Sequence, residues 1–291
     1  MDDGASWELY RSFLGVVREG SLSGAARALG ITQPTVGRHI AALEAALGLT
    51  LFTRSQAGLM PTEAALELRA YAEAMDSNAA ALKRTAEGHG AGVVGTVRVS
   101  ASEVVGVETL PPIVARLRQQ HPQLRLELVL TSRVQDLLRR EADIAIRMAE
   151  PKQEQLIGRR LPDVRVGLYA HRRYIAAHGT PGRADELAQH TLVGFDAETP
   201  FLRAARKALP QWTRAAFSLR SDSDLGQLAL IRAGCGIGVC QVGIAERDPN
   251  LVRVLSRQVE FKLPMWVVMH EDLRSSTRCR ATFDALVEAL R

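Results

Sequence analysis

The sequence is poor in cysteine and has no long apolar run. Its three cysteines, Cys235, Cys240 and Cys279, are too few for a disulfide framework, and none has the C-x₂-C spacing of a metal site. No run of about eighteen uncharged apolar residues occurs, so we expect no transmembrane helix and no membrane partner. The acidic start, MDDGASWELY, lacks the apolar core of a signal peptide. We therefore expect a cytoplasmic protein without a metal or a cofactor.

The chain also lacks a basic N-terminal region, although its total net charge is +5. Residues 1–60 hold five arginines and five acidic residues and carry no net charge, and residues 61–90 carry −2. Residues 91–291 therefore carry +7. Overall charge is thus no argument for nucleic-acid binding near the N-terminus, which would depend on a few well-placed arginines. The excess over residues 91–291 is compatible with an acidic small-molecule ligand.

Signature motifs of common enzyme classes are missing as well. The sequence contains no G-x-S-x-G elbow, no H-E-x-x-H zinc motif and no phosphate-binding P-loop. The glycine-rich segment GCGIG at residues 234–238 follows an expected helix and leads into an expected strand, which is the reverse of a dinucleotide-binding fingerprint. We therefore predict no catalytic residue.

A helix–turn–helix pattern is present over residues 21–40, SLSGAARALGITQPTVGRHI. Ser21 or Ser23 can cap a short first helix, and Gly30 suits the turn that follows it. Thr32 can cap the second helix. That helix has a buried apolar stripe and a polar face that can bond base edges and phosphates in a DNA major groove. An ordinary helical hairpin with a solvated polar face is the alternative from this pattern alone.

Two further patterns follow this hairpin. Residues 51–54 and 59–60 can form a small wing, with Arg54 placed to reach a phosphate or the minor groove. From Thr62 to about residue 88 an alanine-rich helix without Pro or Gly carries a seam of heptad type, which predicts dimerisation. Packing of this helix on its own domain is the alternative. The seam residues are Leu68, Tyr71, Met75, Asn78, Leu82 and Thr85.

Glycine-rich residues 89–95 predict a domain boundary, and strands and helices alternate beyond it. Strands at 96–101, 124–130 and 144–147, with helices at 110–120 and 134–141, predict a βαβαβ unit with a parallel sheet. A second unit has strands at 166–170, 191–195, 217–220 and 237–240 and helices at 174–178 and 225–233. A strand at 265–269 and a helix at 281–290 close the chain. These units predict two α/β lobes, with the chain crossing from the first to the second near Arg165 and returning near Pro264.

Ligands of open α/β sheets bind outside the carboxyl ends of the strands, next to helix N-termini. Hydroxyls, backbone N–H groups and Arg147 at these ends suit a carboxylate or a similar small anion. The alternative is that Ser102 and Ser221 only cap helices and that Arg147 pairs with Glu150 or Asp143. The predicted effector-binding residues are Ser100, Ala101, Ser102, Thr131, Arg147, Phe195, Ser221 and Asp222.

The first third of the chain resembles the DNA-binding domain of LysR-type transcriptional regulators. It departs from the family pattern at Gly37, where serine is usual, and at Pro61 and Ala65, where leucine and glycine are usual. Segments such as RAGCGIGVCQ resemble the family's effector domains, so the resemblance covers essentially the whole chain. The residues in register are Ala25-Ala26, Leu29, Thr32-Gln33-Pro34, Val36, Ile40, Leu43-Glu44, Leu47-Gly48, Leu51-Phe52 and Arg54.

The resemblance implies an α/β protein with an N-terminal winged helix-turn-helix, a long linker helix and a two-lobed, periplasmic-binding-protein-like effector domain. We expect these at residues 4–61, 62–90 and 91–291, with lobe I at 91–164 and 265–291 and lobe II at 165–264. The predicted DNA-binding residues are Ser21, Ser23, Arg27, Gln33, Pro34, Thr35, Arg38, His39 and Arg54.

The expected function is that of a DNA-binding transcriptional regulator whose promoter binding is modulated by a small-molecule effector held between the lobes. The expected partners are double-stranded DNA and the effector. The chain is also expected to form a homodimer or a homotetramer through the linker helix. RNA polymerase is a further candidate partner. A redox-responsive regulator using Cys235 and Cys240 is one alternative. A solute-binding protein, or an enzyme with the same two lobes, is another.

Overall fold

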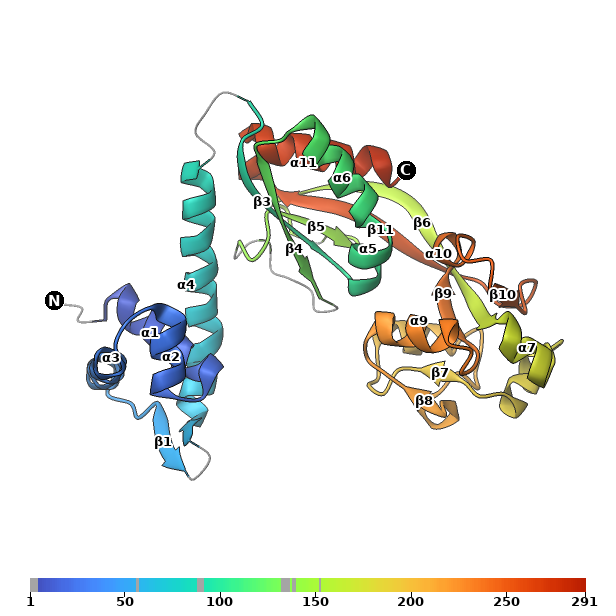
Figure 1. The fold of residues 1–291 in the computed structure, drawn as a ribbon, viewed down its shortest axis with the longest axis horizontal. Helices are drawn as coiled ribbons and strands as arrows, with labels where there is room; N and C mark the ends of the chain where they lie inside the picture. The colour runs from blue at the N-terminus through green and yellow to red at the C-terminus, as the bar shows by residue number, and fades with distance from the viewer. Residues whose placement is uncertain (1–4, 56–57, 88–91, 132–136, 138–139, 152) are drawn as a thin grey trace. The chain divides into compact units, whose positions relative to one another are not determined.

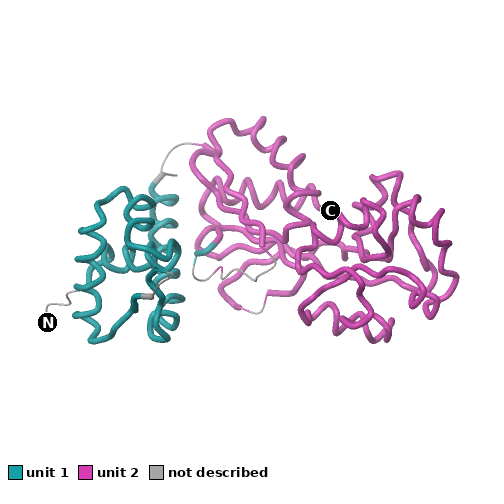
Figure 2. The backbone as a smooth tube through the Cα atoms, turned by 60° about the horizontal axis from the view of Figure 1, so that its bottom comes forward, with its two compact units in different colours: residues 1–86, 139–141 teal, residues 87–138, 142–291 magenta. Residues whose placement is uncertain are grey.

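The computed structural model describes residues 5–55, 58–87, 92–131, 137, 140–151 and 153–291 (Figure 1). The chain divides into two compact units (Figure 2). Unit 1 comprises residues 1–86 and 139–141, and unit 2 comprises residues 87–138 and 142–291. In the described part of the chain, no helix is long and apolar enough to cross a membrane.

Unit 1 has three short helices, a two-stranded wing and one long helix. The strands of the wing pair antiparallel, with Arg54 opposite Leu59. The helices enclose an apolar core that includes Phe13, Val36 and Leu43, and the rings of Phe13 and Phe52 lie 5.8 Å apart. The elements are α1 (Trp7–Glu19), α2 (Leu22–Leu29), α3 (Gln33–Leu47), β1 (Phe52–Ser55), β2 (Gly58–Pro61) and α4 (Glu63–Glu87).

The helix ends of unit 1 follow the predicted cap chemistry. The Ser21 hydroxyl accepts from the Gly24 amide at 3.0 Å, so Ser21 rather than Ser23 caps α2. Thr32 caps α3 by accepting from the Thr35 amide at 3.4 Å. Gly30 has φ of 69°, a left-handed conformation that disfavours a side chain. The predicted winged helix-turn-helix is therefore confirmed.

Helix α4 packs apolar side chains into the core of its own unit near its start. Ala65 and Ala72 are buried in the core of unit 1, and Leu68 packs against that core. Farther along the seam, Tyr71 is 68% exposed and Leu82 is 73% exposed. The alternative of packing within the domain therefore describes about the first three turns, and Asp76 beyond them pairs with Arg18 of α1 at 3.1 Å. Most of the seam is left on the surface. Residues 88–90 of the predicted linker lie outside the described residues.

Unit 2 has two lobes built on one sheet of order β10-β6-β11-β5-β3-β4, with β9 paired to β6. The long strands β6 (Leu156–His171) and β11 (Phe261–His270) run through both lobes (Figure 1). They contain Arg165 and Pro264, the expected crossings, and are longer than the strands expected at 166–170 and 265–269. One apolar cluster lies within lobe II, and a larger one extends from lobe I to α9, β9 and α10 of lobe II.

The remaining elements of lobe I are β3 (Gly95–Ala101), α5 (Glu103–Glu108), α6 (Leu110–Gln120), β4 (Leu124–Leu130), β5 (Ile144–Arg147), η3 (Glu271–Ser275) and α11 (Thr277–Ala289). Those of lobe II are α7 (Arg172–His178), η1 (Ala184–Gln189), β7 (Val193–Gly194), α8 (Pro200–Ala205), η2 (Arg214–Ala216), β8 (Leu219–Arg220), α9 (Asp224–Arg232), β9 (Gly238–Gln241), α10 (Val242–Ala245) and β10 (Leu251–Val254).

The prediction of a parallel sheet is only partly right, because the sheet is mixed. Strand β3 pairs parallel with β4 and β5, but β11 runs antiparallel to both β5 and β6. The reason is the path of the chain, which returns from lobe II and enters the sheet from the opposite end. The strands expected at 191–195 and 217–220 shorten to the pair β7–β8. Most of the helix predicted at 134–141 lies outside the described residues.

Candidate functional site

Helix α3 presents a polar surface at its N-terminal half. The core takes up Val36 and Ile40, which leaves Gln33, Pro34 and Arg38 exposed on the other side. Thr35 is half-buried next to them. Because a recognition helix contacts base edges mainly through its N-terminal residues, this is the surface of α3 best suited to a DNA groove.

A hydrogen-bond network orders these side chains before any partner binds. Ser23 donates to Oε1 of Gln33 at 3.1 Å, which links α2 to the first residue of α3. The hydroxyls of Thr32 and Thr35 lie 2.8 Å apart, and Arg38 donates to Thr35 at 3.4 Å. Such ordering lowers the entropy cost of placing these groups against DNA.

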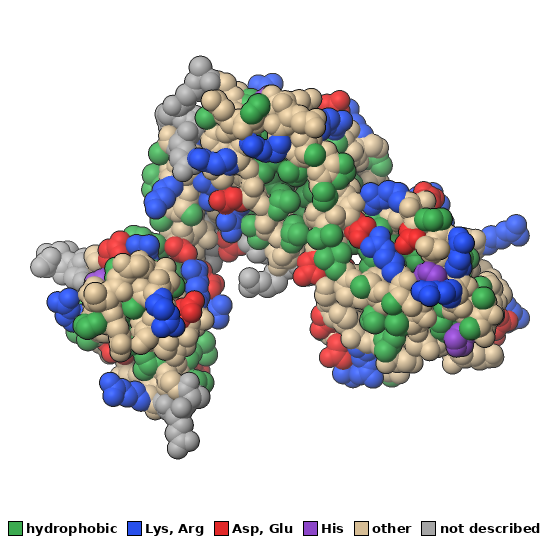
Figure 3. Space-filling model, in the orientation of Figure 1, with side chains coloured by type: hydrophobic (Ala, Val, Ile, Leu, Met, Phe, Trp, Pro, Cys, Tyr) green, Lys and Arg blue, Asp and Glu red, His purple; other side chains and the backbone are tan. Residues whose placement is uncertain are grey.

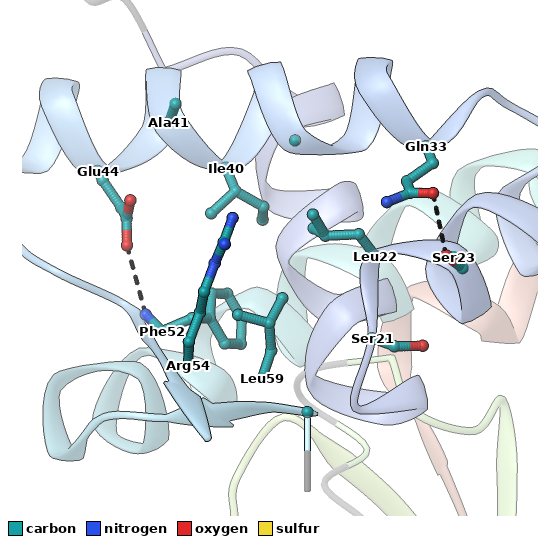
Figure 4. A pocket seen from close by; sticks show the side chains of 12 residues that line it. Ser21, Leu22, Ser23, Gln33, Ile40, Ala41, Glu44, Phe52, Arg54 and Leu59 are labelled. Carbon is teal, nitrogen blue, oxygen red and sulfur yellow. Dashed lines mark hydrogen bonds between the residues drawn. The ribbon is translucent and has the colours of Figure 1, made fainter. Parts of the chain in front are cut away.

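A groove of about 460 Å³ separates α3 from the wing. Arg54 extends from β1 across this groove toward Ile40 (Figure 4). Glu44 of α3 holds the start of β1 in place, because its Oε1 accepts from the amides of Leu51 at 2.7 Å and Phe52 at 3.3 Å. Sequence reasoning missed this role of Glu44. The arrangement brings Gln33 and Arg54 to one groove, where a duplex could meet both.

The other predicted DNA-binding residues lie at different distances from this surface. The Ser21 hydroxyl lines the groove but also caps α2. Arg27 is exposed on α2. His39 is half-buried, with Nδ1 2.7 Å from the hydroxyl of Ser12 on α1, so only its other ring nitrogen is open to a new partner. The roles of all these residues toward DNA stay predictions.

No broad basic field covers the visible face of unit 1. Lysine and arginine side chains are interspersed there with aspartate and glutamate (Figure 3). This agrees with the absence of net charge over residues 1–60. Contacts from individual arginines, rather than a large positive surface, therefore have to provide attraction to phosphates.

Unit 2 contains a second cavity, of about 400 Å³, between its lobes. Of the eight predicted effector-binding residues, Ser102, Phe195 and Asp222 line it. Met148, a sequence-based candidate that follows the strand ending at Arg147, also lines it. The residues that line it and that sequence reasoning missed are Val104, Val166, Thr199, Pro200, Phe201, Asp224, Gln227, Leu228, Val239, Cys240, Gln241 and Leu263. Most of these are apolar, which is typical of small-molecule sites.

The other five predicted residues, Ser100, Ala101, Thr131, Arg147 and Ser221, are not among those that line this cavity. Ser100 is fully buried and accepts from Arg147 at 3.3 Å. The backbone of Thr131 donates to the carbonyl of Ala101 at 2.9 Å, continuing the ladder of β3 and β4. Ser221 accepts from the amide of Ser223 at 3.2 Å. Their role toward an effector stays a prediction.

Acidic groups mark the polar side of this cavity. Burial, and secondarily the charge of nearby Glu103, raises the pKa of Asp224. Asp222 accepts from the backbone amides of Asp196 at 3.0 Å and Ala197 at 2.8 Å. Two carboxyl groups therefore line a mostly apolar space, and burial disfavours the ionised form of one of them, Asp224.

Helices α5 and α9 connect the two lobes beside the cavity. Ser223 donates to Glu103 at 2.6 Å near their N-terminal ends. At their C-terminal ends, Arg232 donates to both oxygens of Glu108, at 2.6 and 2.9 Å. This bond lowers the pKa of Glu108 and raises that of Arg232. A change in the angle between the lobes would have to alter these contacts.

The cysteines give no support to the redox alternative. Burial raises the pKa of Cys240 to about 11, so its thiol stays protonated at neutral pH. The thiolate is the reactive form in disulfide and peroxide chemistry. Cys240 instead lines the cavity between the lobes as a small apolar residue.

Comparison with known proteins identifies both units. A family model described as "Bacterial regulatory helix-turn-helix protein, lysR family" matches residues 7–66, and one described as "LysR substrate binding domain" matches residues 90–291. The HTH-type transcriptional regulator CrgA of Neisseria meningitidis serogroup C (strain 8013) is 30% identical over 285 residues, which covers 96% of this chain and 95% of CrgA.

Solved structures agree with these matches. The structure of CrgA from Neisseria meningitidis, described as a LysR-type transcriptional regulator, aligns with a TM-score of 0.60 and 28% identity over 97% of this chain and 98% of that one. Full-length CbnR, solved in complex with its target DNA, shares the fold at 19% identity, with a TM-score of 0.68 and coverage of 98% and 100%. The chain belongs to the LysR-type transcriptional regulators, which are DNA-binding proteins with a helix-turn-helix head and an effector-binding domain.

Proposed function

We propose that this regulator recognises its promoter through the exposed face of α3, with Arg54 of the wing at the adjacent groove. The observation that carries this proposal is the ordered set of Gln33, Thr35 and Arg38 on one exposed helix surface. Amide, hydroxyl and guanidinium groups can each bond base edges in a major groove. Arg54 adds a contact to phosphate or the minor groove. Because it would bind chromosomal DNA, we place this regulator in the bacterial cytoplasm.

Two copies of the chain bind together in this proposal, through the exposed seam of α4. Tyr71, Met75 and Leu82 are 68%, 40% and 73% exposed, and large apolar side chains in a row on one helix favour an apolar partner. Asn78 on the same seam would fix the register of the pair. A dimer also matches paired DNA half-sites, since each copy supplies one recognition helix.

The cavity between the lobes is the proposed effector site. A ligand that fits one angle between the lobes better than another would shift the population toward that angle. The contacts of α5 with α9 would change with this angle and pass the change on to the spacing of the DNA-binding heads. Coupling of this kind acts equally in both directions, so promoter DNA would change effector affinity by the same factor.

Sequencing of DNA fragments that co-purify with the full-length protein tests the DNA-binding part. We expect the wild-type protein to enrich a common sequence, and the double variant Arg38→Ala/Arg54→Ala to lose this enrichment. Arg280→Ala, on the exposed side of α11, is the matched control and should enrich the same sequence as the wild type. Equal enrichment by all three proteins would overturn the proposed interface.

A further inference from the structure

The residues that line the cavity between the lobes differ in charge from residues 91–291 as a whole. The inference below rests on the proposed effector function of this cavity and adds the class of ligand. Among the residues that the structure describes, those that line the cavity include no lysine, arginine or histidine. They include two aspartates, Asp222 and Asp224. The +7 charge of residues 91–291 is therefore not concentrated at these walls.

Asp222 and Asp224 differ in how far neighbouring groups of the protein stabilise their negative charge. Asp222 accepts two backbone amides, from Asp196 and Ala197, and so already has hydrogen-bond partners. Asp224 lies half-buried at the start of α9, where burial and the neighbouring charge of Glu103 both disfavour its ionised form. A positive group beside Asp224 would offset both effects. A carboxylate ligand would add a third like charge and increase the repulsion.

The apolar walls suit the body of such a ligand. Phe195 and Phe201 line the cavity, with ring centroids 6.3 Å apart in an edge-to-face arrangement. Phe261 supports Phe201 from behind at 5.6 Å. Aromatic faces attract organic cations and stack against other rings. A volume of about 400 Å³ is enough for a molecule with one or two rings.

We propose that the effector is a small organic cation, an amine on an aromatic or similarly apolar body, with its ammonium group at Asp224 and its body packed against Phe195 and Phe201. This differs from the carboxylate expected from the net charge and from Arg147. The structure accounts for the difference, because Arg147 donates to the buried Ser100 and is not among the cavity-lining residues.

Three probes of matched shape test this proposal: 2-phenylethylamine, 2-phenylethanol and 3-phenylpropionate. Each is titrated calorimetrically into the full-length protein at neutral pH. We expect the amine to bind with a Kd about tenfold or more below that of the carboxylate, with the alcohol between them. Asp224→Asn should weaken amine binding by about tenfold and leave the Kd of the alcohol unchanged. Asp284→Asn on the exposed side of α11 is the matched control and should leave all three unchanged.

Several results would overturn the proposal. These are a carboxylate or an alcohol that binds as tightly as the amine, and amine binding that survives Asp224→Asn unchanged. Absence of binding by all three probes, in protein that still shifts promoter DNA, would overturn the ligand class while leaving the DNA-binding function intact. The thermal unfolding midpoint of Asp224→Asn without ligand shows that the variant is folded. Phe201→Leu is the second variant and should weaken the amine and the alcohol together.

Discussion

Gly37 is the residue of α3 at which the sequence differs from the serine expected from the resemblance. A Cβ at this position would meet only Cδ1 of Leu22, at the ordinary contact distance of 3.8 Å. Since glycine inside a helix is less stable than alanine, Gly37→Ala should stabilise the protein by about 0.5–1 kcal/mol. Urea unfolding measures this. Gly30→Ala is the contrasting variant, because a side chain at φ of 69° should cost about 1–2 kcal/mol. Destabilisation by Gly37→Ala would contradict the packing described here.

Glu44 connects the recognition helix to the wing through one side-chain oxygen. Glu44→Ala leaves the amides of Leu51 and Phe52 without this acceptor, and should destabilise unit 1 by roughly 1–3 kcal/mol. Glu44→Gln keeps an acceptor oxygen and should cost less. Chemical unfolding followed by tryptophan fluorescence and circular dichroism measures both. Equal loss in the two variants would mean that the charge of Glu44, and not this bond, is what matters.

At the residue scale, local chemistry was predictable and long-range pairing was not. The caps at Ser21 and Thr32 depend on bonds to the third residue along the chain, so a short window of sequence contains them. The bond between Ser12 and His39 joins positions 27 residues apart. It exists only because α1 and α3 pack together, and no local pattern indicates it.

At the scale of elements, the seam of α4 gives a prediction with a neighbouring control. Leu82→Glu places a charge on the exposed apolar seam, and should convert the proposed dimer to monomers at micromolar concentration. Lys83→Glu changes the next residue, which is exposed and off the seam, and should leave the dimer intact. Sedimentation velocity distinguishes the two. A monomeric wild-type protein, or identical behaviour of the two variants, would contradict dimerisation through this seam.

The ion pair between α5 and α9 predicts a dependence of stability on pH. Arg232 lowers the pKa of Glu108 below its ordinary value of 4.5 in the folded state. The stabilisation is therefore complete above pH 4.5 and is lost as the pH falls through the lowered value. Glu108→Gln and Arg232→Met should both flatten this acid limb. Thermal unfolding between pH 7 and 3 measures it, and acid limbs parallel to that of the wild type would contradict the pairing.

Periodicity predicted most elements but not their directions. The strand at 96–101 shows alternation, the strand at 144–147 is a short run rich in apolar residues, and α3 has an apolar stripe, so each is visible within its own segment. The direction of β11 depends on where the chain returns from lobe II, which no segment records. Short elements such as α10, of four residues, fall below the length at which a periodic pattern can be recognised.

At the scale of the whole molecule, the rule that ligands bind at carboxyl ends of strands located the cavity but not its full lining. Ser102 directly follows β3 and Asp222 comes two residues after β8, and both line it. Ser100 is predicted by the same rule, but it lies within β3, is fully buried and accepts from Arg147. Phe201 and Gln227 belong to helices of lobe II, and they line the cavity because of how the two lobes face each other. That arrangement is a tertiary property without a local sequence pattern.

Above all, we propose that α3 recognises DNA through a few well-placed side chains rather than through a basic surface. The most direct test is the Kd of the full-length protein for its promoter fragment, measured by fluorescence anisotropy at several salt concentrations for the wild type and Arg38→Ala. We predict that Arg38→Ala weakens binding about tenfold or more at every salt concentration, whereas Arg280→Ala leaves it unchanged. Salt-dependent binding that is the same for the wild type and Arg38→Ala would contradict the claim.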